Sequence, residues 1–139
     1  MKRKYCLIAI IALCCGIIAI HIAVRNHDKV HISEPVSCIL TNHTGDENIS
    51  VFLPDSDAKE IAELINGRHF YRDSPACGFS ERASFSISSE STSYTFYAAS
   101  DGCPILYAPD NGKYVKLTEN EAAILHEILE SYGLTFPCV

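Results

Sequence analysis

The sequence predicts an α+β domain of two layers, in which an antiparallel sheet of about five strands carries two helices on one face, behind one N-terminal transmembrane helix. Residues 5–24 contain no Asp, Glu, Lys or Arg, and residues 58–65 and 119–132 carry apolar side chains at helical spacing. Most of the remaining chain consists of short apolar or alternating runs between turn residues. The predicted order is β-β-α-β-β-β-β-α, with an anchor at 1–25, a juxtamembrane linker at 26–35 and the domain at 36–139.

The N-terminal segment is long enough to cross a membrane. A helix of twenty residues rises ~30 Å, which matches the hydrocarbon core of a bilayer. The basic Lys2-Arg3-Lys4 end is expected to stay in the cytoplasm, which places the C-terminal domain outside the cell. Two alternatives remain open. One is a cleaved signal peptide, with His21 and Ala23 at the −3 and −1 positions before the cut, and the other is lipoprotein processing at Cys14 or Cys15. Either would leave the domain secreted or lipid-anchored.

Charge separates the two parts of the chain. Residues 1–25 hold four basic residues and no acid, whereas residues 26–139 hold seven Lys or Arg against seventeen Asp or Glu, a net charge of −10. An acidic domain repels phosphate backbones. Nucleic acid is therefore not an expected partner. The expected partner of residues 5–24 is the membrane, because this segment is apolar.

Four cysteines lie beyond the N-terminal segment, in a compartment where disulfides form. Three pairings are possible. We favour Cys77 with Cys103 and Cys38 with Cys138, because the second pair would tie the start of the domain to its end. Closing a loop of ~100 residues in this way stabilises a fold by ~4.7 kcal/mol in the chain-entropy model.

The first half of the domain is expected to contain two strands, a helix and an edge strand. Val36–Leu40 and Ile49–Leu53 are the strands, and the turn-like residues 42–48 can join them as a hairpin. Asp57 is the expected N-cap of the helix, which Asn66-Gly67 ends. Arg68–Arg72 is the expected edge strand.

The second half of the domain is expected to form an antiparallel meander followed by a helix. Its strands are expected at 84–88, 94–100, 103–108 and 113–117, with Asp101-Gly102 and Asn111-Gly112 supplying turn residues. Thr118 and Glu121 form a capping box for the last helix, which Gly133 ends.

The histidines of the chain suggest alternative catalytic and metal-binding sites. His69 and His126 could serve a small hydrolase or thiol enzyme, but no G-x-S-x-G elbow accompanies them. His27 and His31, with Cys38 and His43 downstream, could bind zinc. His27 and His31 lie in the expected linker, however, and Cys38 is expected to form a disulfide. No catalytic, cofactor or metal site is therefore predicted.

The second face of the sheet is the candidate binding surface. If Phe85, Tyr94 and Phe96 face the helices, Tyr97 points the other way. Tyr114 is expected to join it, together with one of the neighbours Leu106 and Tyr107, of which we favour Tyr107. Such a face could bind a peptide, a glycan or a partner domain. The plainer interpretation is a half-covered sheet with scattered aromatic residues and no partner.

One pattern in the domain resembles a known group of proteins. It consists of Cys77-Gly78-Phe79, Tyr94-x-Phe96, Asp101-Gly102-Cys103, Leu117-Thr118-x-x-Glu121 and Phe136-Pro137-Cys138. It is similar to small exported domains of Gram-positive bacteria, which occur behind a signal or anchor, or as tails on membrane metallopeptidases of the β-lactam-sensor type. The resemblance implies an extracytoplasmic domain with paired cysteines. It carries over no protease activity, because the H-E-x-x-H helix is absent.

These observations together favour a non-enzymatic binding or regulatory module, tethered to the membrane and acting on a protein or peptide outside the cell. They leave the partner and the oligomeric state open.

Overall fold

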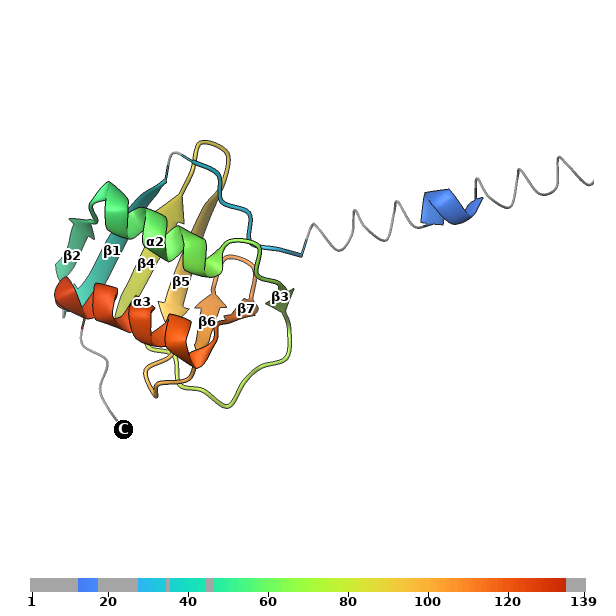
Figure 1. The fold of residues 1–139 in the computed structure, drawn as a ribbon. Coiled ribbons are helices and arrows are strands. Elements are labelled where there is room, and N and C mark those ends of the chain that lie inside the picture. The colour runs from blue at the N-terminus through green and yellow to red at the C-terminus, as the bar shows by residue number, and fades with distance from the viewer. Residues whose placement is uncertain (1–12, 18–27, 35, 45–46, 135–139) are drawn as a thin grey trace, which may run out of the picture.

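A computed structural model describes residues 13–17, 28–34, 36–44 and 47–134 of the chain. One antiparallel sheet and two helices make up the domain, as Figure 1 shows. The α+β class and the single antiparallel sheet are confirmed. A helical turn at 13–17 precedes the domain.

The sheet has seven strands in the order β2-β1-β4-β5-β6-β7-β3. Neighbouring strands are antiparallel throughout. The strands are β1 (Ser37–Thr44), β2 (Glu47–Phe52), β3 (Phe70–Tyr71), β4 (Ala83–Ser88), β5 (Ser93–Ala98), β6 (Ile105–Ala108) and β7 (Lys113–Lys116).

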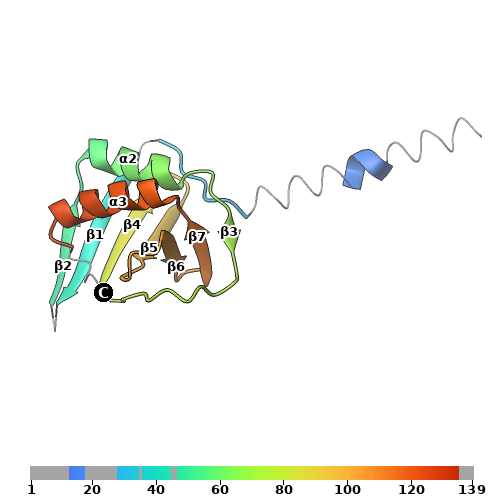
Figure 2. The same cartoon turned by 60° about the horizontal axis from the view of Figure 1, so that its bottom comes forward.

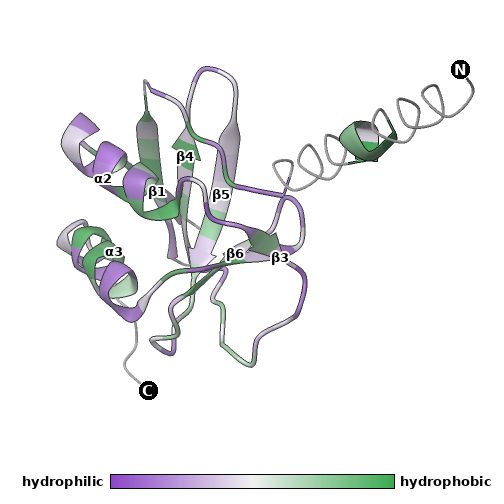
Figure 3. Ribbon diagram, turned by 45° about the vertical axis from the view of Figure 1, so that its right-hand side comes forward, coloured by the Kyte–Doolittle hydropathy of each residue, from purple (hydrophilic) through white to green (hydrophobic). Residues whose placement is uncertain are grey.

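Both helices, α2 (Asp55–Ile65) and α3 (Glu119–Ser131), cover the same face of the sheet, which Figure 2 shows from a second side. Hydrophilic and hydrophobic residues alternate along each helix (Figure 3), as expected of helices that bury one side. The hydrophobic core lies between the helices and this face. At its centre, the rings of Phe85 on β4 and Phe96 on β5 are 1% and 0% exposed, with centroids 5.5 Å apart.

The strand count differs from the prediction of about five. The expected edge strand at 68–72 is present as β3, but it has only two residues, and it pairs with β7 at the far edge of the sheet.

The first hairpin is confirmed but longer than expected. β1 and β2 pair from Ile39 and Phe52 as far as Thr44 and Glu47. Asn, His and Thr in 42–44 suggested a turn because polar residues dominate there, yet cross-strand pairing keeps them extended.

The start of α2 is the second difference. Asp57 was expected to cap the helix, but α2 begins at Asp55 after Pro54, without a side-chain cap. The fixed φ of proline favours an entry into the helix at this point. Asp57 therefore lies in the first turn and is available for another contact.

The start of α3 follows the prediction. The Glu121 N–H donates to the Thr118 hydroxyl, and the Glu121 carboxylate accepts from the Thr118 N–H at 2.8 Å. The capping box is therefore confirmed. Gly133, just beyond the helix, has a φ of 88°, which a residue with a Cβ rarely adopts.

Residues 28–34 fall within the predicted linker 26–35, but they lie against the domain. Val30 and Ile32 are 1% and 6% exposed and belong to the hydrophobic core. The Val30 N–H donates to the Arg68 carbonyl at 2.8 Å. The linker prediction is wrong for these residues, because two apolar side chains among polar neighbours are too short a pattern to reveal a buried segment.

The predicted transmembrane segment 5–24 lies outside the described residues except for the helical turn at 13–17. Within the described ranges, no helix has both the length and the apolar character that a membrane crossing requires.

Candidate binding surface

The face of the sheet opposite the helices carries two kinds of side chain. Over β2, β1, β4 and β5 it presents hydroxyl groups that pair across the strands. Thr41 and Ser50 lie 3.3 Å apart, Ser86 and Thr95 3.1 Å, and Ser88 and Ser93 2.8 Å, measured between their oxygens. At these positions the face is polar but uncharged, and the exposed ring of Phe52 on β2 lies beside them.

Aromatic rings occupy the other half of the face. Tyr97, Tyr107 and Tyr114 stand on the neighbouring strands β5, β6 and β7, and the pairing register places them side by side. Their ring centroids are 6.2 Å apart between Tyr97 and Tyr107 and 5.1 Å apart between Tyr107 and Tyr114. Tyr71 on β3 and Phe79 extend the group, each 5.7 Å from Tyr114. The structure therefore brings the three predicted residues together in a cluster of five rings, called here the aromatic cluster.

Every ring of the aromatic cluster is half-buried. Each therefore keeps part of its surface accessible to solvent. Burial raises the pKa of the Tyr71 phenol, and the neighbouring Tyr114 and Asp73 raise it further. The Tyr71 hydroxyl therefore acts as a neutral hydrogen-bonding group at physiological pH. Aromatic rings with polar tips are suited to contacts that are partly apolar and partly hydrogen-bonded.

Phe79 was not predicted to belong to this surface, and it comes from the long connection between β3 and β4. Its ring lies 5.7 Å from that of Tyr107 as well as that of Tyr114. A β-bridge to Ala99 fixes its backbone beside the end of β5. The only signal in the sequence was its position two residues after Cys77, a predicted disulfide cysteine.

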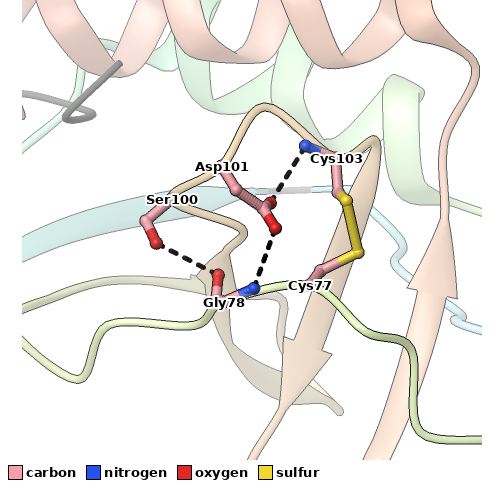
Figure 4. The surroundings of a disulfide bond; sticks show 5 residues. All are labelled: Cys77, Gly78, Ser100, Asp101 and Cys103. Atoms are coloured by element: carbon pink, nitrogen blue, oxygen red, sulfur yellow. Dashed lines mark hydrogen bonds between the residues drawn. A yellow bond between two sulfur atoms is a disulfide. The ribbon is translucent and has the colours of Figure 1, made fainter. Parts of the chain in front are cut away.

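The disulfide between Cys77 and Cys103 holds this connection against the turn between β5 and β6 (Figure 4). The predicted pair is confirmed, with the two Cα atoms 6.2 Å apart. Next to it, the Asp101 carboxylate accepts hydrogen bonds from the N–H groups of Gly78 (3.0 Å) and Cys103 (3.2 Å). The Gly78 carbonyl accepts from the N–H of Ser100 at 2.8 Å. Residues 77–79 are thus fixed by one covalent bond and a set of hydrogen bonds.

Asp101 functions as a structural acceptor in this arrangement. Its pKa is lowered, chiefly because the Gly78 N–H donates to the carboxylate, with a further contribution from the Cys103 N–H. Cys77, Cys103 and Asp101 have the ligand types and the proximity of a metal site. Their sulfurs are bonded to each other, however, and metal coordination by cysteine requires thiolates.

Cys38 lies on β1 in the core, 1% exposed, and carries a free thiol in this structure. Burial raises its pKa to about 12, so the thiol stays protonated and unreactive at neutral pH. Cys138 lies outside the described residues. The pairing of Cys38 with Cys138 therefore stays a prediction.

The histidines considered for catalysis stand on different elements. His69 is exposed and forms a β-bridge with Lys29 at the edge of the sheet. His126 lies in the middle of α3, where burial lowers its pKa and the charge of Glu130 opposes that effect.

The residues considered for zinc are similarly dispersed. His27 lies outside the described residues, and His31 is exposed on the segment that precedes β1. The His43 Nδ1 lies 2.6 Å from the side-chain oxygen of Asn48 across the first hairpin. With Cys38 buried in the core, the described members of this set do not converge on one point.

A surface hollow lies where the segment before β1 meets α2. It is lined by Glu34, Val36, Asp55 and Lys59. The Lys59 ammonium lies 2.7 Å from the Glu34 carboxylate, and both side chains are more than half exposed. An exposed ion pair of this kind stabilises a fold little.

None of the protein-family models, curated proteins and solved structures compared with this chain matches it. The resemblance to exported domains of Gram-positive bacteria stays a prediction.

Proposed function

We propose that this chain is a non-enzymatic binding or regulatory module, tethered to the cell membrane by residues 5–24, that uses its helix-free sheet face to contact a protein or peptide outside the cell. The observation that carries the proposal is the aromatic cluster next to the paired Ser and Thr hydroxyls. Tyrosine with serine is a combination typical of adaptable protein-binding surfaces. Tyr supplies large contact area at low cost in conformational entropy, and Ser supplies hydrogen bonds.

The placement outside the cell rests on the sequence and on the disulfide. The apolar N-terminal segment follows Lys2-Arg3-Lys4, and positive residues favour the cytoplasmic side. A disulfide such as Cys77–Cys103 persists in oxidising compartments. If the N-terminal segment is cleaved, the same domain is secreted or lipid-anchored.

The states of Cys38, Cys77 and Cys103 argue against a thiol enzyme that uses any of these three cysteines. Cys77 and Cys103 are joined, and the Cys38 thiol has a pKa of about 12. A thiol nucleophile needs a lowered pKa and access to substrate. The binding interpretation uses groups that are accessible as they stand.

Site-specific photocrosslinking on intact cells tests the proposal. A photoreactive amino acid replaces Thr95, which is on the helix-free face two residues from Tyr97. The matched control carries the same group at Ala123, which is exposed on α3. We expect a discrete crosslinked product from position 95 that is absent from position 123 and disappears with Tyr97→Ala. No product, or the same products from both positions, would remove the support for a binding face.

A further inference from the structure

The two edges of the sheet differ in how well they are protected. At one edge, β3 has two residues, and the chain before the first hairpin covers it: the Phe70 N–H donates to the Asp28 carbonyl at 2.7 Å. At the other edge, β2 has six residues, and among the residues that the structure describes it pairs with β1 alone. A long unpaired edge is a ready template for another strand.

The register shows which backbone groups of β2 face outward. Leu53 donates its N–H to the Cys38 carbonyl at 3.0 Å, so this pair is hydrogen-bonded. Hydrogen-bonded and non-hydrogen-bonded pairs alternate along an antiparallel ladder. Counting back from Leu53, the backbone groups of Asn48, Ser50 and Phe52 point away from β1.

Two large apolar side chains stand exposed on this edge strand. Phe52 is 74% exposed and Ile49 is 54% exposed, and no other large apolar side chain in residues 28–34, 36–44 and 47–134 is as exposed. They lie on opposite faces of the sheet, because Phe52 is opposite Ile39 and Ile49 is opposite Asn42. Natural edge strands are commonly protected by Lys, Pro or a bulge. The sequence of β2 contains neither Lys nor Pro.

We propose that β2 is a strand-addition site, which binds an extended segment of a partner polypeptide with apolar residues at its centre and Lys or Arg at its ends. The outward backbone groups of Asn48, Ser50 and Phe52 would continue the ladder onto the added strand. The side chains of Ile49 and Phe52 would each pack against an apolar residue on one face of it. This site is distinct from the aromatic cluster, which lies over β5, β6, β7 and β3.

The acidic residues near both ends of β2 favour a partner segment with basic ends over a second copy of this chain. β2 begins at Glu47, and Asp55 and Asp57 follow its other end in the first turn of α2. Antiparallel self-pairing about Ser50 would bring the Glu47 end of each copy towards the Asp55 end of the other. Like charges placed opposite each other destabilise strand pairing, whereas Lys or Arg at these ends would stabilise it.

The test uses the full chain in detergent micelles and a synthetic peptide of about nine residues, with consecutive Val at its centre and two Lys at each end. Consecutive Val residues present apolar side chains on both faces of the added strand. Binding is measured by fluorescence anisotropy, and hydrogen exchange follows the amides of Asn48, Ser50 and Phe52. We expect these amides to exchange more slowly with the peptide. A second peptide with Glu in place of Lys should bind at least ~10-fold more weakly.

Ser50→Pro is the decisive variant. It removes an outward N–H without breaking the pairing with β1, and an edge strand tolerates proline at such a position. Ser50→Ala is the matched control, since it loses only the hydroxyl near Thr41. We expect Ser50→Pro to abolish binding and Ser50→Ala to retain it, with both variants folded by circular dichroism. If Ser50→Pro does not fold, Phe52→Lys replaces it, with the same expected loss.

Three results would overturn the proposal. One is an absence of both binding and amide protection in the wild-type chain. Another is binding that Ser50→Pro or Phe52→Lys leaves unchanged. The third is protection of the same amides by concentration-dependent dimerisation without peptide, which would assign the edge to a second copy of the chain.

Discussion

The hydroxyl of Tyr132, just beyond the end of α3, donates a 2.6 Å hydrogen bond to the carboxylate of Asp57 in the first turn of α2. At the opposite end of the helix pair, Arg68 follows α2 and forms an ion pair with Glu121 at the start of α3. The two contacts connect α2 and α3 at both ends and show that they run antiparallel. They also explain why Asp57 does not cap its own helix, since its carboxylate has a partner in α3.

Replacing Tyr132 with Phe should lower the free energy of unfolding, because the Asp57 carboxylate then loses its donor while the ring is kept. The loss should be smaller than that of a large-to-small change in the core, since the contact is accessible to solvent. Urea unfolding of Tyr132→Phe, Asp57→Asn and the double variant forms a double-mutant cycle. A coupling energy of zero would show that the hydrogen bond does not contribute to stability.

The same contact predicts a spectroscopic signature. The pKa of the Tyr132 phenol is raised, first by its hydrogen bond to Asp57. A raised folded-state pKa gives stability that is present below the ordinary tyrosine pKa and is lost as the pH rises through the folded-state value. Ultraviolet titration should show two phenols ionising late, those of Tyr71 and Tyr132, and Asp57→Asn should lower the pKa of Tyr132 while leaving that of Tyr71 raised.

Glu121 should contribute to stability against acid. Its pKa is lowered, chiefly by the hydrogen bond from the Thr118 N–H, and also by the Thr118 hydroxyl and Arg68. A lowered folded-state pKa gives stability that is present above the ordinary glutamate pKa of 4.5 and is lost as the pH falls through the folded-state value. Glu121→Gln should therefore weaken the fold at neutral pH and flatten its acid dependence. Glu127→Gln removes an equal charge from the exposed side of the same helix and is the control in urea titrations at several pH values.

Removing the Cys77–Cys103 disulfide should have a local effect as well as a global one. The cysteines are 26 residues apart, and a loop of that length corresponds to ~3.5 kcal/mol of stabilisation in the chain-entropy model. We expect the Cys77→Ser, Cys103→Ser variant to lose stability of this order. Hydrogen exchange at Gly78 and Phe79 should accelerate even under conditions where the rest of the domain stays folded. Unchanged exchange there would show that the Asp101 hydrogen bonds hold the segment without the disulfide.

Several features of the fold were predictable from the sequence because they depend on local patterns. The Thr118 and Glu121 capping box, the alternating strands around Phe85 and Phe96, and the opposite orientation of Tyr97 follow from neighbouring residues alone. Hydrogen bonding near the cap and side-chain alternation along a strand require no knowledge of distant contacts.

Features that depend on distant partners could not be predicted in the same way. Val30 is buried because Arg68 and Gly67 pair with its backbone, and nothing near Val30 in the sequence indicates this. Phe79 joins the aromatic cluster because a disulfide holds its segment beside β5. The early start of α2 reflects Pro54 and the availability of Tyr132 as a partner for Asp57.

The state of Cys38 can be determined by differential alkylation of the full chain. The buried free thiol predicts no labelling of Cys38 by iodoacetamide in the folded protein at neutral pH, because the pKa of about 12 leaves almost no thiolate and the core excludes the reagent. In denaturant without a reductant, Cys38 should then be labelled, whereas Cys77 and Cys103 should not. A disulfide to Cys138 would instead keep Cys38 unlabelled until reduction, and peptide mass spectrometry would recover the linked pair. That result would establish the predicted Cys38–Cys138 disulfide, which joins the two ends of the domain.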